Sequence, residues 1–224
     1  MKNLLIILIC FTFYACNDSS SLYFMQQEKD LINNGNNDET MRVVLITNIE
    51  DSVFLRQKSK NISIDDKNLP KLIKRMRATM DVEGGVGIAA VQVGIQRNVI
   101  LIKRFDKSGH VEKDISGKST SSSDNHVDVF INPKVISYSI EKQIFIGDGC
   151  LSIPQYWGNT ERHTSVEVEY YNEKGKLIRE TIYGTSRPND FTAVIFQHEF
   201  DHLQGTLFLD RIYKNELFFE EEQE

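Results

Sequence analysis

The motif QHEFDH, at residues 197–202, constrains this chain more than any other feature because it contains the pattern HExxH. It lies in a largely apolar stretch that we expect to form a helix from residue 189 or 190 to residue 204. On a helix, His198 and His202 project from one face and can share a metal ion. Glu199 can reach a water at that ion without binding the ion itself. The alternative is a pair of surface histidines beside an accidental glutamate.

A metal ion held by two histidines needs a further protein ligand. Downstream of His202, the candidates are Asp210 and the acidic end of the chain, and no further histidine follows. Upstream, Cys150 lies in the segment GDGCLSIP and is the only cysteine of the expected globular domain. A thiolate is a common metal ligand, whereas a lone cysteine is also common as a small buried residue. The residues alone leave both readings open.

A third segment, GVGIAAVQVG at residues 85–94, is rich in small residues. Small residues allow close approach of the backbone to a ligand. Gln92 adds an amide that can donate to a carbonyl oxygen. A nucleotide-binding loop and simple tight packing are the other interpretations, although the third spaced glycine of the nucleotide pattern is missing.

The segments GVGIAAVQ, DGCLS and QHEFDH, in this order, resemble the three signature motifs of the peptide deformylases, GxGxAAxQ, EGCLS and QHExDH. Shorter matching pieces are LR at 55–56, INP at 131–133 and LFLDR at 207–211. The resemblance covers residues 43–213. It implies a metal-dependent hydrolase that removes the formyl group from N-formylmethionyl peptides and releases formate.

The resemblance also implies a role for each motif residue. Cys150, His198 and His202 would hold one divalent metal ion, ferrous iron in most of the family, with zinc, nickel or cobalt able to replace it. Glu199 would act as the general base. The remaining assignments are oxyanion stabilisation by Gln92 and the backbone N–H of Leu151, and contact with the formyl group or the peptide backbone by Gly87.

One motif position departs from the family pattern, because Asp148 stands where the family has glutamate. We expect this acid to support the site rather than bind the metal, with Arg162 as its ion-pair partner. Two other functions stay open. The chain could be a related metallo-amidase or peptidase that acts on other short N-acyl peptides. It could also be a non-catalytic lipoprotein that binds peptides or metal.

The N-terminus resembles the signal peptide of a bacterial lipoprotein. Lys2 precedes an apolar run at residues 4–14, which is too short to span a bilayer as a mature helix. Ala15 and Cys16 follow, as in a lipobox, which implies a lipidated Cys16, a membrane anchor and a place in the cell envelope. The alternative is a cytoplasmic protein whose true start is Met41.

The remaining sequence predicts one α+β domain, with antiparallel sheets packed around the helix that carries HExxH. Its first strong helix is expected near residues 65–80, from an apolar stripe, and a hairpin over 165–183. A net charge of −6 without a basic block argues against a nucleic-acid partner. The sequence indicates no oligomeric state. We divide it into a signal peptide (1–16), a flexible tether (17–40), a catalytic domain (41–215) and an acidic tail (216–224).

Overall fold

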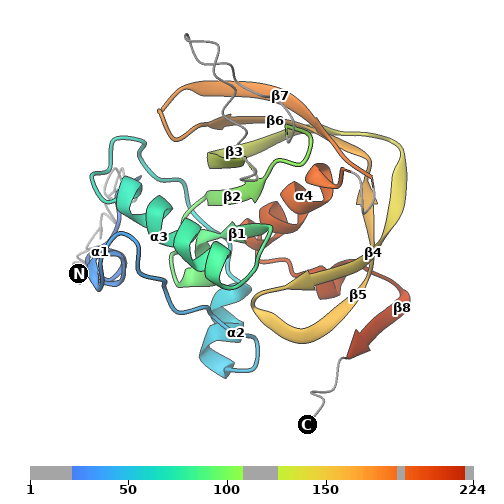
Figure 1. Cartoon of the computed structure of the whole chain (residues 1–224), viewed down its shortest axis with the longest axis horizontal. Helices are drawn as coiled ribbons and strands as arrows, with labels where there is room; N and C mark the ends of the chain where they lie inside the picture. The colour runs from blue at the N-terminus through green and yellow to red at the C-terminus, as the bar shows by residue number, and fades with distance from the viewer. Residues whose placement is uncertain (1–21, 108–125, 186–189, 220–224) are drawn as a thin grey trace, which may run out of the picture.

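A computed structural model describes residues 22–107, 126–185 and 190–219 of the chain (Figure 1). Its helices are α1 (Gln26–Asn33), α2 (Ile49–Leu55), α3 (Leu69–Val82) and α4 (Thr192–Leu203), with the 3-10 helices η2 (Ala90–Val93) and η3 (Phe208–Arg211). Its strands are β1 (Gly87–Ala89), β2 (Val99–Lys103), β3 (Val127–Tyr138), β4 (Lys142–Cys150), β5 (Ile153–His163), β6 (Ser165–Tyr171), β7 (Leu177–Tyr183) and β8 (Ile212–Phe219).

The strands form two sheets, one in the order β1-β2-β3-β6-β7 and one in the order β4-β5-β8. All of their strand pairings are antiparallel. Helix α4 lies between the two sheets and contacts strands of both (Figure 1). The predicted α+β class, with antiparallel sheets around the HExxH helix, is therefore confirmed.

The apolar run of β2 follows from its position, because both of its faces are buried. Ile100 and Ile102 belong to the core around α4, whereas Val99 and Leu101 belong to the core beneath α3. A strand that is covered on both faces reads as a continuous apolar run instead of alternating with polar residues. The same alternation turns Gly87 of β1 toward α4, where its neighbours are side chains of that helix.

The two expected helices and the hairpin are present, with shifted helix ends. Helix α3 begins at Leu69, later than predicted, because Pro70 occupies its first turn. Helix α4 begins at Thr192, whose backbone N–H donates to Asp190 Oδ1 over 2.9 Å. Gly205, at a φ of 72°, follows the end of this helix as expected. Strands β6 and β7 pair in the predicted hairpin.

The predicted flexible tether is wrong for residues 22–40, which contain helix α1. Phe24 and Ile32 are buried in the core beneath α3, and Glu28 is buried against Arg97. The polar composition of the segment conceals this spacing of one buried residue per turn of helix. Residues 17–21, like the predicted signal peptide at 1–16, lie outside the described residues.

The predicted acidic tail also begins too early, because β8 continues to Phe219. Leu217 pairs with Gly158 of β5, and Phe218 and Phe219 pair with its neighbours Trp157 and Tyr156. The rest of the predicted tail, 220–224, lies outside the described residues. In the described part of the chain, no helix is long and apolar enough to cross a membrane.

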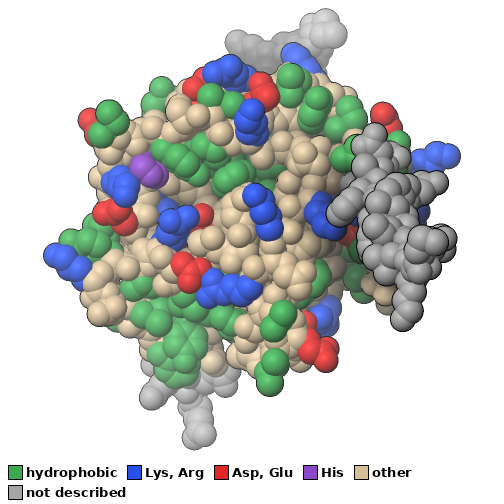
Figure 2. All heavy atoms as spheres, turned by 180° about the vertical axis from the view of Figure 1, so that it is seen from behind, with side chains coloured by type: hydrophobic (Ala, Val, Ile, Leu, Met, Phe, Trp, Pro, Cys, Tyr) green, Lys and Arg blue, Asp and Glu red, His purple; other side chains and the backbone are tan. Residues whose placement is uncertain are grey.

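The surface seen from behind mixes charges of both signs. On this face, Lys and Arg side chains alternate with Asp and Glu, and hydrophobic patches lie between them (Figure 2). Several of the charges are paired on the surface, as in Lys142 with Glu161 and Arg179 with Glu167. Exposed pairs of this kind add little stability, so the fold depends on its two cores.

Candidate active site

The three predicted metal ligands meet at the junction of β4 and α4. Cys150 ends β4 and pairs with Ile153, so Leu151 and the next residue form the tight turn into β5. His198 and His202 project from one face of α4, and their ring centroids are 5.1 Å apart. One potential ligand atom from each of the three side chains lies within 4.8 Å of the others.

This donor set is suited to a divalent metal ion. Metal–sulfur bonds of about 2.3 Å and metal–nitrogen bonds of about 2.0 Å place neighbouring donors roughly 3.5 Å apart on a tetrahedral ion. Cys150 Sγ and His202 Nε2 are 3.2 Å apart. Burial and the adjacent His198 hold the pKa of His202 well below its ordinary value, which keeps a nitrogen lone pair available. Cys150, His198 and His202 therefore form a site that can hold a metal.

Asp148 fixes the orientation of the His198 ring. In metal sites, a carboxylate commonly contacts the ring nitrogen of a ligating histidine that does not bind the metal. Asp148 Oδ1 lies 2.8 Å from His198 Nδ1, which leaves Nε2 free to face the metal position. The other carboxylate oxygen accepts from Thr160 Oγ1 over 2.8 Å and from Arg162 over 2.9 Å. Burial alone would raise the pKa of Asp148, but the charges of His198 and Arg162 hold it well below its usual range. The expected pair of Asp148 with Arg162 is present.

Glu199 is buried at the same pocket and is only 4% exposed. Burial raises the pKa of its carboxyl to about 7, against the opposing charge of His198. Its Oε2 atom has no hydrogen-bond partner among the described residues. Gly87 lies directly against it, since a Cβ on Gly87 would be 2.6 Å from Glu199 Oε1 and 2.8 Å from Ile195. The glycine therefore makes room for the carboxylate.

Gln92 and Leu151 lie beside Cys150 in the same pocket. The side-chain oxygen of Gln92 accepts from the backbone N–H of Ala89 over 2.8 Å. This fixes the amide so that its NH₂ group faces Cys150, with Nε2 3.5 Å from Sγ. Leu151 lines the pocket directly after the cysteine. Gln92 can therefore donate to a group bound beside Cys150.

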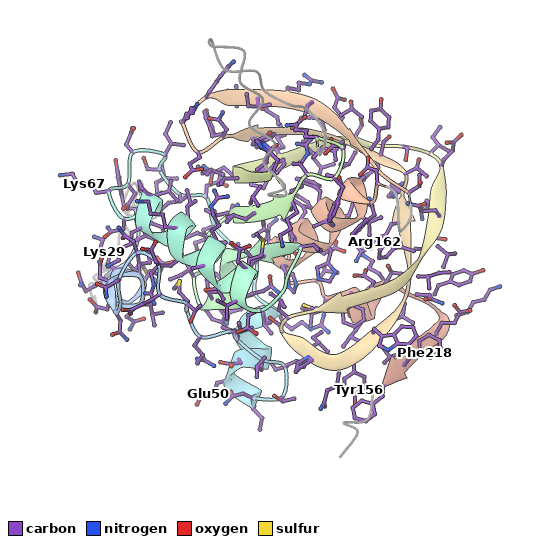
Figure 3. The ribbon with its side chains drawn as sticks, in the orientation of Figure 1. Lys29, Glu50, Lys67, Tyr156, Arg162 and Phe218 are labelled. Carbon is purple, nitrogen blue, oxygen red and sulfur yellow. The ribbon has the colours of Figure 1, made fainter. Side chains whose placement is uncertain are left out.

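The pocket is a cavity of about 400 Å³ that both polar and apolar residues line. Val86, Ile153 and Val194 are among the apolar residues that line it. Tyr156 and Trp157 form part of its rim. Figure 3 shows Arg162 in the interior beside α4, whereas Tyr156 projects outward from β5. Of the predicted site residues, His202 is fully buried beneath the cavity, and the others except Cys16 line it.

Three residues that support the site were not assigned a role from the sequence. Asp201 accepts from Arg162 over 2.6 Å, and Thr160 donates to Asp148. Gln197 fixes α4 to the end of β5, because its side chain bonds both backbone groups of His163. Gln197 and Asp201 belong to the motif QHEFDH, so the sequence marks them as candidates. Thr160 lies in none of the three motifs.

Comparison with known proteins agrees with this geometry. The family model of polypeptide deformylase matches residues 43–217. The peptide deformylase of Pseudothermotoga lettingae is 35% identical over 164 residues, covering 73% of this chain and 80% of that protein. That of Desulforudis audaxviator is 33% identical over 177 residues, covering 78% and 98%.

Solved structures give the same result. A peptide deformylase from Synechococcus elongatus, in complex with actinonin, superposes with a TM-score of 0.61 at 31% identity, covering 78% of this chain and 80% of that one. A class I type b peptide deformylase from Acinetobacter baumannii, bound to Met-Ala-Ser, gives a TM-score of 0.62 at 30% identity, covering 78% and 99%. The match over most of the chain, with the site residues in place, shows that the chain belongs to the polypeptide deformylase family.

Proposed function

We propose that this chain removes the formyl group from N-formylmethionyl peptides by hydrolysis. One observation carries the proposal: the Cys150, His198 and His202 donors, the buried carboxyl of Glu199 and the amide of Gln92 meet at one cavity. The relative from Acinetobacter baumannii was solved with the peptide Met-Ala-Ser, which has the sequence of a deformylated product. The apolar residues that line the cavity suit a methionine side chain.

Each residue then has a defined task. Glu199 would accept a proton from the attacking water and deliver it to the leaving amine, for which a pKa of about 7 is well matched. Gln92 Nε2 and the backbone N–H of Leu151 would donate to the oxygen that becomes negative as the formyl carbon is attacked. Gly87 would lie against the formyl group or the peptide backbone. When bound, the divalent ion would supply Lewis-acid activation of the water.

We infer that the ion is Fe²⁺, with Zn²⁺, Ni²⁺ and Co²⁺ as alternatives. A thiolate with two imidazoles suits these borderline-soft ions better than it suits calcium or magnesium. Metal analysis of protein purified without air tests this inference. Protein that contains no bound transition metal after such purification would contradict the assignment of the ligands.

The decisive experiment measures formate release from formyl-Met-Ala. We expect Glu199→Gln to reduce turnover at least about 100-fold, because it removes the general base. The matched control is Glu167→Gln, the same chemical change on β6, where Glu167 pairs with Arg179 at the surface. Wild-type protein that releases acetate from acetyl-Met-Ala faster than formate from formyl-Met-Ala would favour a different N-acyl amidase. Unchanged turnover in Glu199→Gln would refute the proposed mechanism.

We also propose that the protein is anchored in the cell envelope through a lipidated Cys16. The order of charge, apolar run, small residue and cysteine at residues 2–16 supports this. The alternative start at Met41 would remove α1, although Arg75 bonds the backbone oxygens of residues 31, 32, 39 and 40. A protein beginning at Met41 would leave this buried guanidinium without those four acceptors.

Labelling of cells with a palmitate analogue tests the anchor. We expect the full chain to incorporate the label and Cys16→Ala to lose it. Cys10→Ala is the matched control, because Cys10 lies in the same N-terminal segment but would be removed with the signal. A Cys16→Ala protein that still carries the label, or that still fractionates with membranes, would contradict the anchor while leaving the deformylase proposal intact.

A further inference from the structure

A continuous chain of charged contacts connects the protein surface to a predicted metal ligand. Arg211, in η3, donates to both oxygens of Asp201 over 3.1 and 2.8 Å. Asp201 accepts from Arg162 Nη1 over 2.6 Å, and Arg162 Nη2 donates to Asp148 over 2.9 Å. Asp148 contacts the Nδ1 atom of His198 over 2.8 Å. Each neighbouring pair in this series is in direct contact, so a change at Arg211 can affect His198 through the residues between them.

With His198 neutral, as a metal ligand must be, the side-chain charges of this series of contacts balance only when Arg211 is included. The buried part contains two carboxylates, Asp148 and Asp201, and one guanidinium, Arg162, with side chains 5%, 9% and 2% exposed. One buried cation cannot neutralise two buried anions, and an uncompensated buried charge is strongly unfavourable. Arg211, whose side chain is 48% exposed, supplies the second positive charge through a bidentate contact.

The position of Arg211 is set independently of this pair. Asp210, its neighbour in η3, accepts from the backbone N–H of Leu207 over 2.8 Å and also pairs with Arg56. The 3-10 turn is therefore fixed by other contacts, and the Arg211 side chain reaches inward from it to Asp201. Removing this guanidinium would leave the turn in place and remove a charge from the chain of contacts.

We propose that Arg211 is a positioning residue of the metal centre, acting through Asp201, Arg162 and Asp148 on the ring of His198. Without it, Arg162 is the only buried cation among the described residues that contacts both carboxylates, and its guanidinium moves toward Asp201. Asp148 then loses part of the contact that orients it, and His198 loses part of its support. The inference rests on the proposed function, because it assumes that His198 binds the metal.

The test compares full-length wild type, Arg211→Ala and Arg211→Lys loaded with Co²⁺. The first readout is the rate at which a chelator removes the ion, and the second is the visible absorption spectrum of the bound Co²⁺. Contacts to metal ligands change metal affinity about 10- to 100-fold. Because Arg211 acts from farther away, we expect about 10-fold faster release in Arg211→Ala and an intermediate rate in Arg211→Lys. The matched control is Arg179→Ala, which breaks the exposed pair with Glu167.

A purely structural role would lower the unfolding temperature without changing the Co²⁺ spectrum or its rate of loss. Wild-type release rates in Arg211→Ala would overturn the inference, whatever the activity of the variant. If Arg211→Ala does not fold, Arg211→Lys decides, and release within twofold of wild type would overturn the inference. A wild-type chain that binds no Co²⁺ would refute the proposed function itself, which distinguishes the two failures.

Discussion

Replacing Glu28 with alanine should destabilise the whole domain, although this residue precedes the segment that matches the family. The Glu28 side chain is 7% exposed and that of Arg97 is 3% exposed. Arg97 donates to the carboxylate from Nε over 2.9 and 3.1 Å and from Nη2 over 2.7 Å. The variant removes every one of these contacts and leaves a guanidinium buried beneath α1.

The magnitude follows from what Arg97 retains. Removing one partner of a buried ion pair typically costs about 3–5 kcal/mol. Arg97 keeps the backbone oxygens of Tyr23, at 2.6 Å, and Asn61, at 3.2 Å, so we expect a loss near about 3 kcal/mol. For a domain of this size, each kcal/mol shifts the unfolding temperature by about 2–4 °C, which gives a decrease of about 6–12 °C.

The assay is reversible urea unfolding of the domain from residue 22 onward, followed by circular dichroism. Glu173→Ala is the matched control, because Glu173 makes an exposed pair with Arg77 over 3.3 Å. We expect that change to cost less than about 0.5 kcal/mol. If Glu28→Ala and Glu173→Ala had equal stability, α1 would not be docked in solution and the segment would behave as a tether.

Four other measurements test the site and the fold. Gly87→Ala should reduce kcat about 100-fold, because its Cβ would displace the Glu199 carboxylate from a distance of 2.6 Å. In a pH profile, kcat/KM should fall as the pH drops through a midpoint at or below 7, since burial raises the pKa of Glu199 to about 7 and a bound cation lowers it. Chelation should abolish formate release and Fe²⁺ should restore it. A protein that begins at Met41 should lack a cooperative unfolding transition, which calorimetry measures.

The site was predictable from sequence where its residues lie close together along the chain. The i, i+4 spacing of His198 and His202 reports helix geometry directly. Cys150 is brought to them by strand pairing and helix packing, which no local pattern encodes. Only the order of the three motifs indicated it before the structure was known. Thr160 shows the limit, because it reaches Asp148 across two paired strands and no motif includes it.

The prediction of a flexible tether fails at residues 22–40 for a physical reason. Its polar composition is typical of a flexible linker, and a short helix is marginal by its own propensity. Helix α1 is stable here because Arg75 and Arg97, far along the chain, require its backbone oxygens and Glu28 as partners. These contacts depend on buried arginines elsewhere in the sequence, so the residues of the segment alone do not predict that its helix is stable.

Asp148 stands where the family has glutamate, and its contacts account for this departure. A carboxylate that supports a metal ligand must orient the imidazole and must have its own charge compensated. Asp148 meets both requirements, since one oxygen contacts His198 and the other accepts from Thr160 and Arg162. The strand is irregular directly before it, with a register shift between Phe145 and Asp148. The side chain is one methylene shorter than the family glutamate, yet it already has a partner for each oxygen, so the substitution is compatible with an oriented His198.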